Sequence, residues 1–275
     1  MYGMKVEDRV LQELHRAASD AGRRGIAIPS ADLPAVARRT GGQQPASQAI
    51  QRLLRQGRVV RVRKDLLVLP DTTGLLGVDM ADLVAAIAPH PYLITGGRAL
   101  EHHDLTDQHF FGVVVLVPRE IKNFEFRGQT TRFLKTDVSN IWGWTPGGKA
   151  ARYAKAERAI VDVLNHPRYG VSLTQALDGL LLAVRRNPAF LDRLLSAVTR
   201  YSSGARHHSS RAAARRVGLA VERLFGAEAA EPFRHLIGAN RAPVLMRPGG
   251  SRTGDLDSDW RVIVNAAVAP EGSPA

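Results

Sequence analysis

Side chains that can hydrogen-bond to nucleic-acid bases recur at helical spacing between residues 44 and 55. At about 100° per residue, one side of a helix here carries Gln44, Gln48, Gln51 and Arg55, flanked by Ser47 and Arg52. A glutamine amide can form two hydrogen bonds with adenine, and an arginine can do the same with guanine. The other side is apolar: Ala46, Ala49, Ile50, Leu53 and Leu54. The pattern favours a helix that reads the major groove, but an ordinary helix with a solvated face has the same pattern.

Capping and turn residues delimit this helix and the one before it. Ser30 is expected to cap a first helix, whose first turn contains Asp32. Gly41 and Gly42 should end that helix, because glycine reaches the left-handed conformations that a tight turn needs. The second helix opens at Gln44-Pro45 and should end at Gly57. A further amphipathic helix over 5–21 should pack beneath both.

A basic hairpin is expected directly after the second helix. Residues 58–63 alternate arginine and valine, 64–65 form a turn, and 66–69 return as an apolar strand. This places Arg61, Arg63 and Lys64 near the outer face and tip. Residues 33–64 contain no acid and eight cations, as expected where phosphates are neutralised: Arg38, Arg39, Arg52, Arg55, Arg58, Arg61, Arg63 and Lys64. We therefore predict a winged helix-turn-helix that binds double-stranded DNA within residues 1–70.

The composition agrees with a nucleic-acid partner and argues against several other classes. The chain has 275 residues, a net charge of +12 and a pI of about 10.7. It has no cysteine, which excludes disulfides and cysteine-ligated zinc. No apolar run is long enough for a membrane span or a signal core, so we expect a cytoplasmic protein. Abundant alanine and the excess of arginine over lysine are typical of high-GC bacterial genomes.

The chain beyond residue 70 has the pattern of a larger α+β domain. We expect a linker over 71–77 and a mixed α/β domain over 78–275 that includes a helical block. Strands are expected at 92–95, 112–118, 129–134 and 141–144, with a late strand at 260–265 that returns to the same sheet. Helices are expected at 78–88, 97–103, 153–165, 173–186, 189–201 and 209–225.

Three other groups of residues could in principle carry chemistry. His102, His103, Asp104 and His109 resemble metal ligands, but adjacent histidines on a helix diverge by about 100° and no cysteine completes a set. The sequence 249–257 echoes a nucleotidyltransferase Gly-Ser and Asp-x-Asp signature, but the spacing is too short to cross between strands. Glu157, Arg158 and Asp162 share a helix, where Glu157 could pair with Arg152, and a structural ion pair is favoured over catalysis. We expect no catalytic residue, metal or cofactor.

A second basic cluster follows residue 200. Its members should project outward from a helix: Arg206, Arg211, Arg215 and Arg216. A solvated face, a nucleic-acid contact and a patch for an acidic partner all remain open for it.

Three passages together resemble the AbiEi-type antitoxins of bacterial type IV toxin–antitoxin systems. They are the basic hairpin at 57–63, the Leu-Ile-Thr-Gly-Gly-Arg-Ala-Leu segment that continues through 93–108, and the Glu-Arg-Ala-Ile-Val-Asp helix within 156–164. The chain departs from the family pattern at Asp104, where glycine is usual, and at the hairpin turn 64–66. The resemblance implies a repressor that binds repeats upstream of its own operon. It also implies an antitoxin that counteracts a nucleotidyltransferase-like toxin without a stable complex.

Two classes of function are therefore open. The first is a DNA-binding autorepressor and antitoxin without catalysis. The alternative is an enzyme that acts on nucleic acid or on the toxin, with the winged helix as a targeting module. An adjacent gene for a nucleotidyltransferase would favour the first, and turnover of a nucleotide or nucleic acid would favour the second.

Overall fold

The computed structural model describes residues 5–20, 27–70, 78–147, 151–203, 208–239 and 242–269. In these ranges the chain is mixed α+β, with many helices and three β-sheets, and no helix there is both long and apolar enough to span a bilayer. Two compact units divide the chain. The first comprises 1–90, 121–132 and 146–152, and the second comprises 91–120, 133–145 and 153–275. The expected linker at 71–77 lies outside the described residues, so a domain boundary there stays a prediction.

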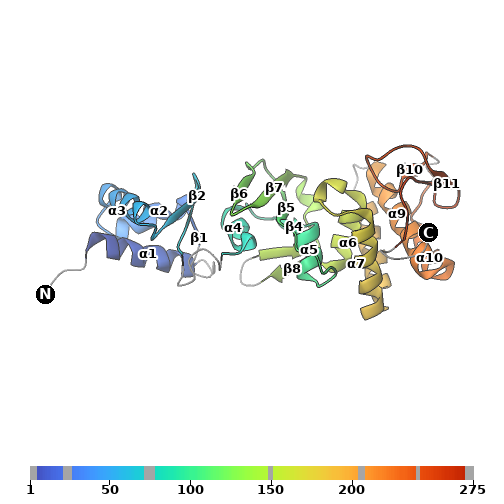
Figure 1. Ribbon diagram of the computed structural model, residues 1–275, viewed down its shortest axis with the longest axis horizontal. Helices are drawn as coiled ribbons and strands as arrows, with labels where there is room; N and C mark the ends of the chain where they lie inside the picture. The colour runs from blue at the N-terminus through green and yellow to red at the C-terminus, as the bar shows by residue number, and fades with distance from the viewer. Residues whose placement is uncertain are drawn as a thin grey trace. The chain divides into compact units, whose positions relative to one another are not determined.

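The N-terminal elements of the first unit surround one small apolar core (Figure 1). In chain order they are α1 (Val6–Asp20), β1 (Ala27–Pro29), the 3-10 helix η1 (Ser30–Asp32), α2 (Leu33–Arg39), α3 (Gln43–Arg55), β2 (Val60–Arg63) and β3 (Leu66–Val68). Further on, α4 (Met80–Ile87) contacts β1. β1, β3 and β2 form an antiparallel sheet with β3 in the centre. The helix and hairpin expected at 44–57 and 58–69 are thus present.

Glycine ends both α2 and α3 in the way that the sequence predicts. After α3, Gly57 has φ +70° and its N–H donates to the Leu54 carbonyl at 3.2 Å. The N–H of Arg58 donates to the Leu53 carbonyl at 3.0 Å, which completes a Schellman motif. After α2, Gly42 has φ +112° and its N–H donates to the Ala37 carbonyl at 2.8 Å. These turns provide hydrogen-bond donors for the last carbonyls of each helix, and they set the directions in which α3 and the hairpin leave them.

Ser30 has a different role from the expected helix cap. The 3-10 helix η1 separates it from α2, whose N-cap is Asp32 without a side-chain cap bond. The Ser30 hydroxyl donates to the Lys64 carbonyl at 3.3 Å, and its N–H donates to the Asp65 carbonyl at 2.8 Å. Ser30 therefore holds the turn of the β2–β3 hairpin. The expectation failed because a serine's hydrogen-bond partner can lie far away in sequence.

The largest sheet has six strands in the order β6-β7-β5-β4-β9-β8. β4 pairs antiparallel with β5 and parallel with β9. The bounds of its strands and of the short helix α5 are β4 (Leu93–Thr95), α5 (Gly97–His102), β5 (Gly112–Val117), β6 (Phe124–Phe126), β7 (Gln129–Lys135), β8 (Trp144–Gly147) and β9 (Ala151–Ala154). The strand expected at 141–144 begins only at Trp144. The helix expected from residue 153 begins at Ala156, because Tyr153 belongs to β9.

The second unit ends in a helical block and a small separate sheet. Its elements are η2 (Val138–Asn140), α6 (Ala156–Asn165), η3 (Pro167–Tyr169), α7 (Leu173–Arg186), α8 (Phe190–Ser202), α9 (His208–Phe225), α10 (Ala227–Arg234), β10 (Val244–Leu245), β11 (Asp255–Asp257) and β12 (Val262–Val264). The late strand β12 was expected to rejoin the large sheet, and this was wrong. It pairs with β10 and β11 instead.

The contacts of Trp260 explain why β12 does not join the six-stranded sheet. The indole is fully buried, and its Nε1 donates to the Glu222 carboxylate of α9 at 2.7 Å. A Cβ placed on Gly218 of α9 would lie 2.0 Å from the indole, so the ring packs directly on the bare helix backbone. This contact holds the residues before β12 on α9 rather than on the six-stranded sheet.

We predict that Gly57→Ala destabilises the end of α3 by about 1–2 kcal/mol, because an L side chain in the left-handed region clashes with its own backbone. Gly57→Asn should cost less, since asparagine tolerates that region. Hydrogen exchange of amides within α3, followed by mass spectrometry on the intact chain, measures both variants. Gly112→Ala is the control, because a Cβ at Gly112 meets nothing within 4 Å. Equal protection in Gly57→Ala and wild type would contradict the assigned backbone conformation.

Candidate nucleic-acid interface

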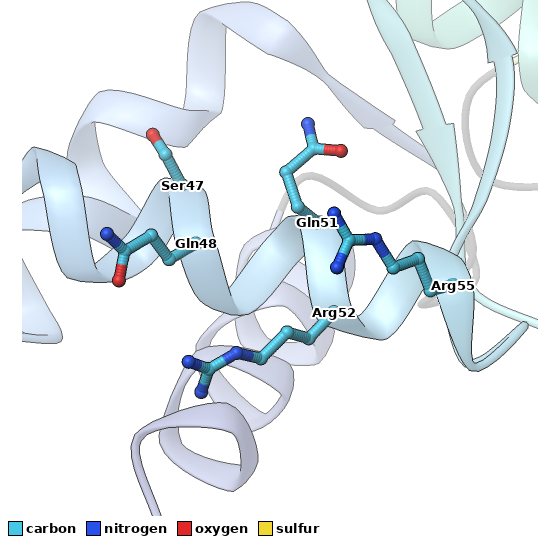
Figure 2. Close-up of a pocket in the computed structure, with 5 residues that line it drawn as sticks. All are labelled: Ser47, Gln48, Gln51, Arg52 and Arg55. Atoms are coloured by element: carbon cyan, nitrogen blue, oxygen red, sulfur yellow. The ribbon is translucent and has the colours of Figure 1, made fainter.

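The face of α3 that the sequence predicts to be polar is exposed. Its members, the polar face from here on, are Gln44, Ser47, Gln48, Gln51, Arg52 and Arg55. All except Gln44 line a shallow depression of about 300 Å³ on the helix surface. In Figure 2, Ser47 and Gln51 project on one flank of the polar face and Arg52 on its other flank. The amides, the hydroxyl and the guanidinium groups thus lie on one continuous surface.

The opposite side of α3 is buried, which confirms the predicted division of the helix. Ala46, Ala49, Ile50 and Leu53 are all at most 6% exposed, and Leu54 is half-buried. They share one core with apolar residues of α1, α2 and the hairpin: Val10, Leu14, Ala18, Ile28, Val36, Ala37, Val59, Leu67 and Leu69. Burial of this side leaves the polar face as the only side of α3 that a large ligand can approach.

Acidic residues of α1 neutralise three of the arginines that border α3. Within the described chain, Arg39 pairs with Glu13 at 3.2 Å and Arg52 pairs with Glu7 at 2.9 Å. Arg58 pairs with Asp8 at 3.4 Å. These ion pairs could not be predicted from the acid-free stretch 33–64, because the acids belong to a different helix.

Two other predicted cations keep their charge uncompensated. Among the residues that the structure describes, neither Arg38 nor Arg55 forms an ion pair, and both are exposed. Arg38 lies in the last turn of α2, where a cation also interacts favourably with the helix dipole. These two guanidinium groups are available to an anionic ligand.

The β2–β3 hairpin presents Arg61 and Lys64 but not Arg63. Arg61 and Lys64 are exposed, and the Arg61 guanidinium donates to the Lys64 carbonyl at 3.2 Å. Arg63 forms an ion pair with Asp65 at 2.5 Å, and its side chain is only 18% exposed. The register of β2 against β3 shifts between Arg61 and Arg63, which is a bulge. Strict alternation would put both arginines on one face, and the bulge turns Arg63 away.

The second basic cluster does not form a surface patch as expected. Arg206 lies outside the described residues, and Arg211 is exposed. Arg215 and Arg216 are only 2% and 9% exposed. Arg215 donates to the Ala242 carbonyl, and Arg216 donates to the Leu245 carbonyl and to the Asn165 side chain, each at 2.7 Å. Burial lowers the pKa of Arg216 to about 10. These two arginines hold the C-terminal segment on α9, where the helical pattern predicted outward cations.

The histidines that could have formed a metal site engage protein groups instead. The ring of His102 stacks on Tyr153, with centroids 4.1 Å apart, and burial lowers its pKa. The Nε2 of His103 is 2.8 Å from the Ala154 carbonyl, and the Nδ1 of His109 is 2.6 Å from the Glu101 carboxylate. Within the described residues, no group of three or more histidine, aspartate or glutamate side chains could hold an ion.

The second unit contains a buried polar cluster around Asp162. The carboxylate accepts from the Thr95 hydroxyl at 2.7 Å and from the Arg158 Nε at 2.9 Å, and all three residues are at most 2% exposed. The Arg158 guanidinium lies 4.3 Å from the Trp142 ring centroid and 5.1 Å from that of Tyr201. A structural ion pair is thus present on this helix, but it joins Arg158 to Asp162, whereas the sequence suggested a pair formed by Glu157.

Two side chains beside that cluster, His166 and Tyr201, have shifted pKa values. The His166 Nε2 is 2.6 Å from the Tyr201 hydroxyl, and burial lowers the pKa of His166 and raises that of Tyr201. Such shifts can mark a catalytic site. Here the bonding groups pair with one another in the interior, which favours a structural role.

Comparison with known proteins identifies a similar structure and no family. The crystal structure of the RV2827C protein from Mycobacterium tuberculosis matches with a TM-score of 0.62 and 14% identity, over 94% of this chain and 90% of that one. At this identity the likeness shows the shared fold alone. No family model and no curated protein matches the chain. Membership of the AbiEi-type family therefore stays a prediction.

We predict that Asp162→Ala lowers the free energy of unfolding by about 3–5 kcal/mol, because it leaves the Arg158 charge buried without its partner. Urea unfolding followed by tryptophan fluorescence reports on the second unit, which contains Trp142, Trp144 and Trp260, the chain's three tryptophans. The double variant Arg158→Met with Asp162→Leu removes both charges and should lose less than the single variant. A larger loss in the double variant would contradict an uncompensated charge as the cause.

Proposed function

We propose that this protein binds double-stranded DNA through a winged helix-turn-helix in which α2 and α3 are the two helices and β2–β3 is the wing. The observation that carries the proposal is the polar face of α3. It is exposed, contains three glutamines and no acid, and lies opposite a fully packed apolar side. Helices of this kind enter the major groove, which is wide enough to admit an α-helix.

The polar face has the chemistry for direct readout of bases. Gln44, Gln48 and Gln51 offer amides that match the donor and acceptor of adenine, and Arg55 offers a guanidinium that matches guanine. Gln44 and Arg55 are 11 residues apart, and at 1.5 Å per residue this distance corresponds to about five base-pair steps. Ser47 lies within the same depression as Gln48 and Gln51. We assign sequence recognition to these side chains.

Other cations are assigned to the phosphate backbone. Arg38, Arg61 and Lys64 are exposed at the end of α2 and on the wing. Arg39, Arg52 and Arg58 share their charge with acids of α1, so each would contribute less to the attraction of phosphates than a free cation. Contacts of this class fix the register of a protein on the duplex but carry no sequence information.

The biological role that we propose is autorepression of an operon together with antitoxicity. It rests on the resemblance to AbiEi-type antitoxins, in which the N-terminal domain binds operator repeats and the C-terminal domain protects against a nucleotidyltransferase-like toxin. Such a division needs separate structural units, and the chain contains two, of which the first includes residues 121–132 and 146–152 besides 1–90. In this proposal the protein is not an enzyme and needs no cofactor.

We predict that Gln48→Ala, Gln51→Ala and Arg55→Ala each weaken operator binding by about 1–3 kcal/mol, because each would lose a contact to a base edge. Gel shifts on operator and scrambled duplexes measure the effect. Binding to scrambled DNA should change little for the two glutamine variants, which remove no charge. Gln12→Ala is the matched control, since Gln12 is an exposed glutamine of α1 and does not belong to the polar face. Equal losses on both duplexes would contradict base readout.

We also predict that the double variant Gln51→Ala, Arg55→Ala still protects cells from the cognate toxin when the toxin is expressed from an unrelated promoter. Promoter replacement removes repression as a source of protection, and the variant leaves the second unit intact. Growth of cells that co-express toxin and variant is the measurement, with wild type as the reference. Loss of protection in step with loss of DNA binding would show that one surface serves both activities.

A further inference from the structure

A segment far from the wing in sequence belongs to the same compact unit. Residues 121–132, which include β6, group with residues 1–90. The Arg63 guanidinium donates to the Lys122 carbonyl at 3.1 Å and lies 5.6 Å from the centroid of the Phe124 ring. The wing therefore contacts the strand that opens the β6–β7 hairpin.

Lys122 adds a cation at this contact. Its side chain is exposed, and in the described part of the chain its ammonium group forms no ion pair. The acid of β6 is Glu125, the residue after Phe124, and successive side chains of a strand point to opposite faces. Because Phe124 faces Arg63, Glu125 is directed away from the wing. The surface beside the wing is thus extended by a positive charge without a nearby compensating acid from β6.

The contacts of Arg63 connect the wing to the segment 121–132. Its guanidinium makes three contacts, with Asp65, the Lys122 carbonyl and the Phe124 ring. The bulge in β2 turns it toward these partners while Arg61 stays exposed. A half-buried guanidinium with this many partners positions its neighbours and is poorly placed to meet a phosphate itself.

We infer that the wing and the start of β6 form one phosphate-binding edge. In this edge Lys122 contacts the backbone of the bound duplex beside the phosphates that Arg61 and Lys64 contact. Arg63 is a positioning residue that keeps Lys122 next to the wing. The inference rests on the proposed DNA binding and extends its interface to a segment of the chain beyond residue 120.

The test measures the salt dependence of DNA binding by the full chain. Lys122→Ala should reduce the slope of log affinity against log salt by about 0.9, the change expected for one lost phosphate contact. Near 0.1 M salt the affinity for operator and for scrambled duplex should fall alike, by roughly fivefold to tenfold. Lys155→Ala is the matched control, because Lys155 is an exposed lysine of the second unit. Its slope should equal that of wild type.

A double-variant cycle tests the role of Arg63. If Arg63 acts by positioning Lys122, then Arg63→Ala and the double variant Arg63→Ala, Lys122→Ala should have the same slope as Lys122→Ala alone. Additive changes in slope would show that Arg63 meets its own phosphate and would overturn the positioning role. Circular dichroism of each variant establishes that the fold is retained.

The outcomes separate this inference from the proposed function. Wild-type protein that binds no duplex DNA would overturn the proposed function and this inference with it. Wild-type protein that binds operator DNA, with Lys122→Ala indistinguishable from Lys155→Ala, would overturn the shared edge alone and leave DNA binding by α3 and the wing in place.

Discussion

The contact between α1 and α3 is the constraint on which the proposed interface depends. Ala49, Ile50 and Leu53 of α3 lie in one core with Val10 and Leu14 of α1. A rotation of α3 by one residue, about 100°, would bury a glutamine amide in that core and expose Ile50. An amide buried without a partner costs several kcal/mol, which a small domain cannot easily offset. The apolar contact thus determines which side chains of α3 meet solvent.

Much of this arrangement could be predicted from sequence because it depends on local patterns. The 3.6-residue period of α3 identifies both its faces, and its observed start at Gln43 is one residue from the predicted start. Glycine at positions 42 and 57 predicts turns because few other residues adopt a positive φ. The same reasoning predicted β4, β5, β7, β12 and most helices after residue 90, since their hydrophobic runs are clearly bounded. It missed the short strands β6, β9, β10 and β11.

The side-chain positions that could not be predicted from sequence depend on contacts with residues that are distant in the chain. Arg63 leaves the outer face because of a bulge and because Phe124 lies nearby, and neither is visible in a run of alternating residues. Arg215 and Arg216 are typical of a solvated helix face, yet carbonyl groups of the C-terminal segment satisfy them in the interior. Such burial is exceptional for arginine and requires partners that only the tertiary structure supplies.

The acids of α1 that pair with arginines near α3 bear on how quickly the protein would locate one site in a genome. A protein surface with many unpaired cations stays bound to duplex DNA of any sequence. Long residence at non-target sites slows the search for the target site. Glu7, Asp8 and Glu13 reduce that attraction and leave the neutral amides of α3 unchanged. Occupancy of a target depends on the ratio of specific to non-specific affinity over about 10⁶–10⁹ competing sites. In the proposed interface, a helix outside the polar face would help to set that ratio.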